Sequence, residues 1–270
     1  MGWCSPILKN MMNLISDTFK LFSRHTYKAS TAFALGLLTL GGFTAAQADM
    51  IIDTTRVIYN GSKRDATFKV SNVSKEAPAF VQMWLDDGNS SASPEDAVAP
   101  FNLTPPVARL KPDSSQVVRM VFTGEPLPPD RESVFYFNML ELPQKSAEEN
   151  KLSFAIRSRI KVFYRPKAVK GDPMEWIDKI IWKIVKKDKN WVAEGTNTSP
   201  FHISFFNLNL GDNGKFELLV DGGMLPPKGS ASITLGEVGK VKPSYKSIKV
   251  EYINDFGGPI SKVHAVNSDN

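Results

Sequence analysis

The segment Lys151–Arg165 reads KLSFAIRSRIKVFYR and decides the fold class of this 270-residue chain. Ordinary strands contain about 3–10 residues, whereas this run would extend for roughly 50 Å at about 3.3 Å per residue. Pro166 ends it, because proline cannot donate to a strand ladder. Apolar side chains share one parity, interrupted by Ser158, and basic side chains share the other. The apolar set is Leu152, Phe154, Ile156, Ile160 and Val162, and the basic set is Arg157, Arg159 and Lys161. A strand of this length is predicted to cross a whole sandwich and lead into the next domain.

Shorter runs rich in Val, Ile, Phe and Tyr, separated by turn signals, continue this pattern on both sides. They are Arg56–Tyr59, Thr67–Val70, Ala79–Leu85, Gln116–Phe122, Val134–Leu140, Trp191–Glu194, Ile203–Asn209, Ser230–Leu235 and Lys246–Ile253. Many short strands at such spacing are typical of sandwiches or barrels, and only Asp172–Ile177 is expected to form a short helical turn. The predicted class is all-β, with two immunoglobulin-like β-sandwich domains at residues 49–166 and 174–270 and a linker at 167–173.

The first 48 residues have the composition of a secretory signal peptide. The uncharged, largely apolar run Ala32–Phe43 is too short to span a bilayer as a helix, which needs about 20 residues. Basic residues precede this run, and the small-x-small sequence Ala46–Ala48 follows it. We therefore expect export and cleavage after Ala48; an uncleaved amino-terminal anchor is the alternative. Translation starting at Met11 or Met12 would account for the length of the leader before the apolar run.

The leader also carries most of the net charge of +5. Four basic residues and one acid within it contribute +3, which leaves +2 for the mature chain. Such a small charge gives no reason to expect a nucleic-acid partner, and no later segment is long and apolar enough for membrane insertion. The single cysteine, Cys4, leaves with the leader, so the mature chain is expected to contain no disulfide.

The mature sequence shows no catalytic or metal-binding pattern. Its two histidines, His202 and His264, have no second histidine or cysteine at metal-ligand spacing, and nucleophile-elbow, P-loop and dinucleotide motifs are missing. The acids Asp86, Asp87, Glu95 and Asp96 lie in a stretch rich in Ser, Asn and Pro, which we interpret as a solvated loop and not a calcium site. No cofactor and no metal are expected.

Two other functions are compatible with an exported sandwich. Four tryptophans could form a carbohydrate-binding platform, although burial in the sandwich cores is the simpler interpretation: Trp84, Trp176, Trp182 and Trp191. A hydrolase is the weaker alternative, since no nucleophile and base are arranged for it.

Several longer segments together carry a family resemblance. They are TRVIYNG at Thr55–Gly61, TPP at Thr104–Pro106, RLKP at Arg109–Pro112, DRESVFYFN at Asp130–Asn138, IKVFYRP at Ile160–Pro166 and YINDFGG at Tyr252–Gly258. In this order they cover essentially the whole mature chain, and they resemble the periplasmic chaperones of the chaperone–usher pilus pathway, the PapD-like family. The resemblance implies two sandwiches in a boomerang arrangement, a periplasmic location and a chaperone that is not an enzyme.

The resemblance also implies a mode of binding. Pilus subunits are similar to immunoglobulin domains that lack their last strand, and the chaperone lends one to fill the open groove. Leu152, Phe154 and Ile156 are the candidate side chains for that groove, the alternative being that they pack in the chaperone's own core. The capped subunit is then delivered to an outer-membrane usher. Pairing of two free chaperones through the same edge is a further hypothesis.

Two sets of charged residues follow from the same resemblance. Arg56 and Lys161 are expected to bind the subunit's carboxyl-terminal carboxylate, the alternative being that they are ordinary solvated charges. Strict alternation places Lys161 on the strand face opposite Ile156, so a bulge or strong twist between them is one way to reconcile the two roles. Glu132, Arg165 and Asp255 are expected to form an ion network that links the two domains.

Overall fold

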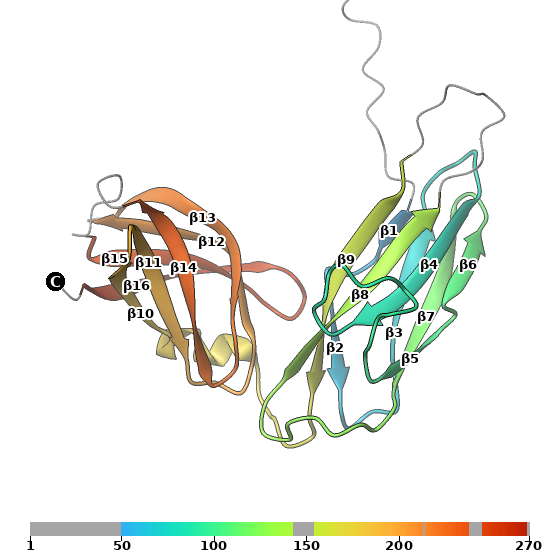
Figure 1. Cartoon of the computed structure of the whole chain (residues 1–270), viewed down its shortest axis with the longest axis horizontal. Helices are drawn as coiled ribbons and strands as arrows, with labels where there is room; N and C mark the ends of the chain where they lie inside the picture. Colours follow the sequence, from blue (N-terminus) through green and yellow to red (C-terminus); the bar gives the residue numbers. More distant parts are fainter. Residues whose placement is uncertain (1–49, 143–153, 213, 238–244, 269–270) are drawn as a thin grey trace, which may run out of the picture. The chain divides into compact units, whose positions relative to one another are not determined.

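The computed structural model describes residues 50–142, 154–212, 214–237 and 245–268. Within these ranges the chain forms two immunoglobulin-like β-sandwiches and one short helix, which confirms the predicted all-β class (Figure 1). The sequence alternates apolar and polar residues along most strands, so each strand can place one face in a core and the other toward solvent. No described helix is long and apolar enough to cross a membrane.

The first sandwich consists of two sheets whose strands are mostly antiparallel. One sheet has the order β1-β3-β7-β5, and its strands are β1 (Met50–Ile52), β3 (Ala66–Asn72), β7 (Ser114–Phe122) and β5 (Phe101–Thr104). The other has the order β2-β9-β8-β4-β6, and its strands are β2 (Arg56–Asn60), β9 (Ile156–Arg165), β8 (Ser133–Leu142), β4 (Ala79–Asp86) and β6 (Val107–Leu110). The pair β2–β9 is parallel, and the other pairs are antiparallel.

The second sandwich is one continuous sheet of seven strands in the order β13-β12-β15-β16-β10-β11-β14. A parallel pairing of β10 with β16 joins its two halves. The strands are β10 (Ile181–Lys187), β11 (Asn190–Asn197), β12 (Ile203–Asp212), β13 (Lys215–Leu225), β14 (Gly229–Glu237), β15 (Ser247–Ile253) and β16 (Pro259–Ser268).

Each sandwich has its own hydrophobic core. In the first, Val81, Met120, Phe137 and Val162 are almost completely buried between the sheets. In the second, the fully buried side chains include Trp182, Phe205, Leu208 and Tyr252. Full burial of such side chains contributes roughly 1.5–3 kcal/mol each, so packing can maintain both cores without a disulfide.

The segment between the sandwiches is partly ordered by the second core. The 3₁₀ helix η1 (Pro173–Lys179) covers most of the predicted helical turn, and the Asp172 side chain caps it by accepting from the backbone N–H of Met174 at 2.7 Å. Val169, within the predicted linker, is buried in the second core. This stretch therefore contributes packing as well as connection.

Strand β9 is shorter than the run that predicts it. It begins at Ile156, because Phe154 and Ala155 have no strand pairing, and residues 151–153 lie outside the described residues. From Ile156 to Tyr164 its register with β8 is continuous, pairing Glu141 with Ile156 at one end and Ser133 with Tyr164 at the other. No bulge interrupts this described part of the strand, so residues of opposite parity project from opposite faces.

Candidate functional site

Arg56 and Lys161 lie side by side where β2 begins. The parallel ladder between β2 and β9 pairs Arg56 with Lys161 and continues to the pair of Asn60 with Arg165. Two distant segments of sequence thus bring two cationic side chains to one place, as expected from the resemblance to a carboxylate-binding pair.

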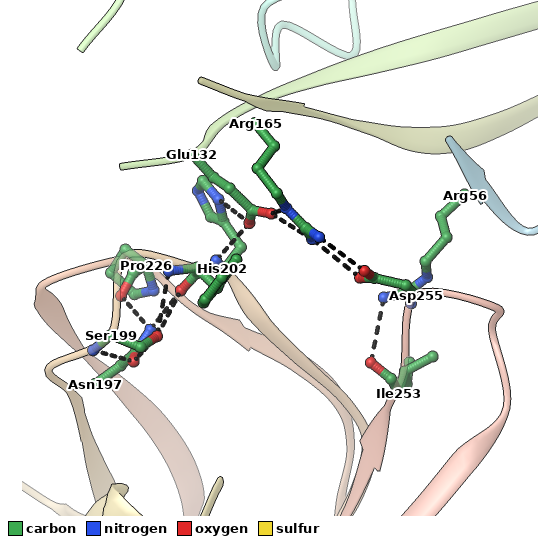
Figure 2. Close-up of polar contacts among 10 residues, drawn as sticks. Arg56, Glu132, Arg165, Asn197, Ser199, His202, Pro226, Ile253 and Asp255 are labelled. Atoms are coloured by element: carbon green, nitrogen blue, oxygen red, sulfur yellow. Dashed lines mark hydrogen bonds and ion pairs between the residues drawn. The ribbon is translucent and has the colours of Figure 1, made fainter. Parts of the chain in front are cut away.

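Burial changes the electrostatics of both cations. Arg56 is only 9% exposed, and its Nη1 donates to the Ile253 carbonyl at 3.4 Å while its Nε has no hydrogen-bond partner (Figure 2). Burial lowers the pKa of Arg56, although the charges of Asp255 and Glu132 act in the opposite direction. Burial, and then the charge of Arg56, also lower the pKa of Lys161.

These two cations are suited to bind an anion. Within the described residues, no carboxylate lies within 4.0 Å of the charged nitrogens of Arg56 or Lys161. Two partly desolvated like charges repel each other, so a carboxylate placed between them would relieve the repulsion and accept charge-assisted hydrogen bonds.

A second charged cluster joins the two sandwiches. Arg165, at the end of β9, donates from Nε to Glu132 Oε1 at 2.8 Å and from Nη1 to Asp255 Oδ2 at 2.9 Å (Figure 2). Its Nη2 also donates to Asp255 Oδ1 at 3.2 Å, which makes the pair with Asp255 bidentate. The other oxygen of Glu132 accepts from the backbone N–H of His202 at 2.8 Å. The expected three members are therefore in contact.

The environment of this cluster favours its charged form. The guanidinium of Arg165 lies 4.8 Å from the ring centre of Phe201, in the second sandwich. Burial lowers the pKa of Arg165, but the hydrogen bonds and charges of Asp255 and Glu132 outweigh burial, so its pKa is raised. Glu132 itself is almost completely buried. Glu132 thus accepts hydrogen bonds from Arg165 of its own sandwich and from the His202 N–H of the other sandwich, and these bonds connect the two domains.

The two described candidates for filling the subunit groove are exposed to solvent. Phe154 is 73% exposed and Ile156 is 43% exposed, so neither packs in the chain's own core. Leu152 lies outside the described residues. Because the register is continuous, Ile156 and Lys161 occupy opposite faces of β9, and the bulge that could have reconciled their roles is not present between them.

Half of β9 has an open edge. Strand β2 pairs only with Lys161–Arg165, whereas β8 pairs along Ile156–Tyr164. Within the described residues, Ile156–Ile160 therefore has a partner on one side only. A strand added there would continue the line of β2 and meet Arg56 and Lys161 at its end.

One charged cluster is not predicted from the sequence. Asp86 is the last residue of β4 and is completely buried, so its assignment to a solvated loop is wrong. It binds Arg159, lies 3.6 Å from Arg157, and accepts from Asn138 Nδ2 at 2.7 Å. Burial raises the pKa of Asp86, but these hydrogen bonds outweigh burial and lower it.

A signal for this cluster is nevertheless present in the sequence. Arg157 and Arg159 share one face of β9. Where other residues cover that face, the two positive charges need a carboxylate partner. The guanidinium of Arg157 lies 4.8 Å from the ring centre of Trp84, and that of Arg159 lies 3.7 Å from the ring centre of Tyr136. Asp86 has the same parity as Trp84 along β4 and so reaches the same face.

The tryptophans do not form a surface platform. Trp84 and Trp182 are buried in different sandwiches, and Trp182 Nε1 donates to the Tyr252 hydroxyl at 3.1 Å. Trp176 and Trp191 are partly buried against the second core. Among the described residues, no group of three or more His, Cys, Asp or Glu side chains could hold a metal ion.

Comparison with known families decides the identity of the fold. The family model described as "Pili and flagellar-assembly chaperone, PapD N-terminal domain" matches residues 49–170. The model described as "Pili assembly chaperone PapD, C-terminal domain" matches residues 175–264. The chain belongs to the PapD family of pilus-assembly chaperones.

Individual members of the PapD family match over most of their length. The chain is 40% identical over 233 residues to the chaperone protein FimB/FhaD of Bordetella pertussis, covering 83% of this chain and 91% of that protein. It is 33% identical over 232 residues to the chaperone protein PapD of Escherichia coli, covering 83% and 88%.

Solved structures of PapD-like chaperones have the same fold. The crystal structure of the CupB2 chaperone of Pseudomonas aeruginosa superposes with a TM-score of 0.65 at 32% identity, covering 80% of this chain and all of that chain. A complex of the Salmonella enterica SafB chaperone with the SafA pilin matches with a TM-score of 0.66 at 26% identity, covering 82% and 98%.

Proposed function

We propose that this protein is a periplasmic chaperone that binds, folds and caps pilus subunits by donating a strand, and then delivers them to an outer-membrane usher. Membership of the PapD family and the similarity to a chaperone in complex with a pilin support this function. The structural observation that most strongly supports this function is the open edge of β9, which ends at Arg56 and Lys161.

The geometry of β9 supports one orientation for the subunit strand. An added strand that runs parallel to β9, as β2 does, points its carboxyl end at Arg56 and Lys161. There the terminal carboxylate would accept hydrogen bonds from both cations. This anchor sets the register, and register matters because a slip of one residue turns every side chain to the opposite face.

The two faces of β9 then have separate roles. Phe154 and Ile156, with Leu152 before them, enter the apolar groove of the subunit. Lys161, on the opposite parity, binds the carboxylate. Burying one such apolar side chain contributes roughly 1.5–3 kcal/mol, so a few of them can stabilise an incomplete subunit without ATP. We propose on this basis that the protein has no enzymatic activity.

Replacing Lys161 tests the carboxylate site. Lys161→Ala removes one cation, and we expect it to abolish co-purification of a co-expressed pilus subunit from the periplasm while the chaperone stays folded. Lys69→Ala, an exposed lysine on β3, is the matched control and should leave recovery unchanged. Circular dichroism and urea unfolding check the fold of both variants. Normal subunit recovery with Lys161→Ala would contradict the proposed site.

The remaining assignments extend this proposal. Residues 1–48 form a cleaved leader, residues 49–166 and 174–270 form the two domains, and residues 167–173 connect them. Amino-terminal sequencing of the exported protein that found Met1 intact would refute cleavage. The free chaperone is also proposed to pair with a second copy through the open edge of β9, which sedimentation at increasing concentration would reveal.

A further inference from the structure

Phe256 is the most exposed large apolar side chain among the described residues. It is 93% exposed and lies at the tip of the turn Asn254–Gly258 between β15 and β16. An isolated exposed apolar residue is common on protein surfaces and needs no explanation by itself. Here its neighbours along the chain are both fixed against the first sandwich.

The turn that carries Phe256 is held by several hydrogen bonds. The Asn254 side-chain oxygen accepts from the N–H groups of Phe256 at 3.0 Å and Gly258 at 2.9 Å. The backbone of Asn254 also exchanges hydrogen bonds with Gly257 and Gly258. Gly257 has a φ of +85°, which favours glycine. The backbone conformation of Gly257 and the side-chain hydrogen bonds of Asn254 together define the shape of this turn.

The residues on either side of Phe256 contact the first sandwich near the two cations. Asp255 forms the bidentate pair with Arg165, and the Ile253 carbonyl accepts from Arg56 (Figure 2). A Cβ added to Gly257 would overlap Thr55 Oγ1, so this glycine packs directly against the residue before Arg56. The backbone of Phe256 is thus held beside the proposed carboxylate site, with its ring in solvent.

We propose that Phe256 packs against an apolar or aromatic side chain near the carboxyl end of the bound subunit strand. This inference rests on the proposed function, because the charges of Arg56 and Lys161 would fix the position of that carboxyl end. A ring on a well-held backbone loses little conformational freedom on binding, so an aromatic contact there favours the complex. Phe256 is then a residue that sets preference among subunits, and Arg56 and Lys161 read the carboxylate that all of them share.

Synthetic peptides test this contact. The parent peptide is a short strand of alternating valine and threonine that ends in phenylalanine with a free carboxylate. One derivative ends in alanine, and another has an amidated end. Binding is measured by calorimetry to the mature chaperone, to Phe256→Ala and to Val263→Ala. Val263 is an exposed valine in strand β16 of the same hairpin and serves as the matched control.

The expected result is selective. Phe256→Ala weakens binding of the phenylalanine-ended peptide by about two- to tenfold and leaves the alanine-ended peptide unchanged. Val263→Ala changes neither affinity. Since the ring of Phe256 is exposed, its removal should leave thermal unfolding unaltered.

Three other results would overturn the inference in distinguishable ways. If amidation weakens binding but Phe256→Ala does not, the carboxylate site stands and the role of Phe256 is wrong. If amidation and Lys161→Ala both leave affinity unchanged, the proposed carboxylate site fails and this inference fails with it. If Phe256→Ala lowers pilus assembly in cells without weakening any peptide, Phe256 contacts a later partner instead.

Discussion

Ionisable side chains in this chaperone differ mainly in what surrounds them. Asp86 and Glu132 are buried and accept hydrogen bonds from arginines, whereas Lys161 is partly buried beside another cation. The first two are satisfied within the chain, so their role is structural. Lys161 has its charge unmatched among the described residues, which makes it suited to a partner. Residue type alone does not separate these roles, but solvent exposure and neighbours do.

His264 makes the stability of the second sandwich dependent on pH. Trp182 donates to the Tyr252 hydroxyl, which in turn lies 2.8 Å from His264 Nε2 and can donate to it while the ring is neutral. Burial, and then the charge of Lys262, lower the pKa of His264 to about 4, although Asp178 acts in the opposite direction. The unfolded chain protonates His264 near pH 6.5, so the folded state loses stability below that pH and the loss is complete below about pH 4.

We expect the free energy of unfolding to fall by about 2 kcal/mol between about pH 7 and about pH 5 because of His264. Urea unfolding at the two pH values measures this change. His264→Gln, which cannot be protonated in this range, is expected to lose that part of the pH dependence even if it is less stable overall. An equally steep pH dependence in His264→Gln would contradict the assignment.

At the scale of elements, strand β9 combines a structural half and an open half. Lys161–Arg165 lies between β2 and β8, whereas Ile156–Ile160 pairs only with β8. An unpaired strand edge with exposed apolar residues favours aggregation in most proteins. In the proposed strand donation the same edge is the working surface, which would account for the exposure of Phe154 and Ile156.

Placing a charge at Phe154 tests this surface. Phe154→Asp would force a carboxylate into an apolar groove, so we expect subunit affinity to fall by about tenfold or more. The chaperone itself should remain folded, since the Phe154 side chain is largely exposed. Affinity is measured by titrating a refolding subunit with each variant. Val117→Asp, at an exposed position of β7, is the control, and equal affinity of Phe154→Asp and the wild type would rule out the groove contact.

The Asp86 cluster connects β4, β8 and β9 on the sheet face away from the core. Asp86→Ala would leave Arg157 and Arg159 without their buried acid, and we expect the free energy of unfolding to fall by about 3 kcal/mol. Urea unfolding measures the change, and hydrogen exchange should show reduced protection in β9. Asp65→Ala removes an exposed ion pair with Arg119 and is expected to cost at most about 0.5 kcal/mol. Equal effects of the two substitutions would show that burial of Asp86 does not matter.

At the scale of the whole molecule, we expect Glu132 to couple the unfolding of the two sandwiches. It accepts from Arg165 and from the His202 N–H, and its own N–H donates to the Pro200 carbonyl at 2.9 Å. Glu132→Ala leaves a buried N–H and a buried cation short of an acceptor. We expect a loss of about 2–3 kcal/mol and two separate transitions in calorimetry in place of one.

An exposed ion pair between the same two sandwiches provides the control. Asp130, in the first sandwich, pairs with Lys228 in the second, and both side chains are exposed. Asp130→Ala should therefore leave the calorimetric transition unchanged within error. If Asp130→Ala separated the transitions as much as Glu132→Ala, number of contacts rather than burial would explain the coupling.

The sequence by itself determined the all-β class and the family, because these depend on alternation and on motifs read along the chain. Arg56, Glu132, Arg165 and Asp255 all lie within such motifs, so their grouping is implied by the family resemblance that the motifs carry. The alternation places the start of β9 too early, since periodicity shows where a strand can form and pairing with β8 decides where it does.

Only the tertiary structure decided the surroundings of these residues. It buried Asp86, left Ile156–Ile160 of β9 paired on one side only among the described residues, and exposed Phe256 close to the segment that contacts Arg56. Burial, open edges and unmatched charges depend on which distant segments pack together, and local sequence carries little information about that. The chemistry of the site follows from its residue types. The order and direction of the strands decide where β9 has an open edge and which way an added strand would run.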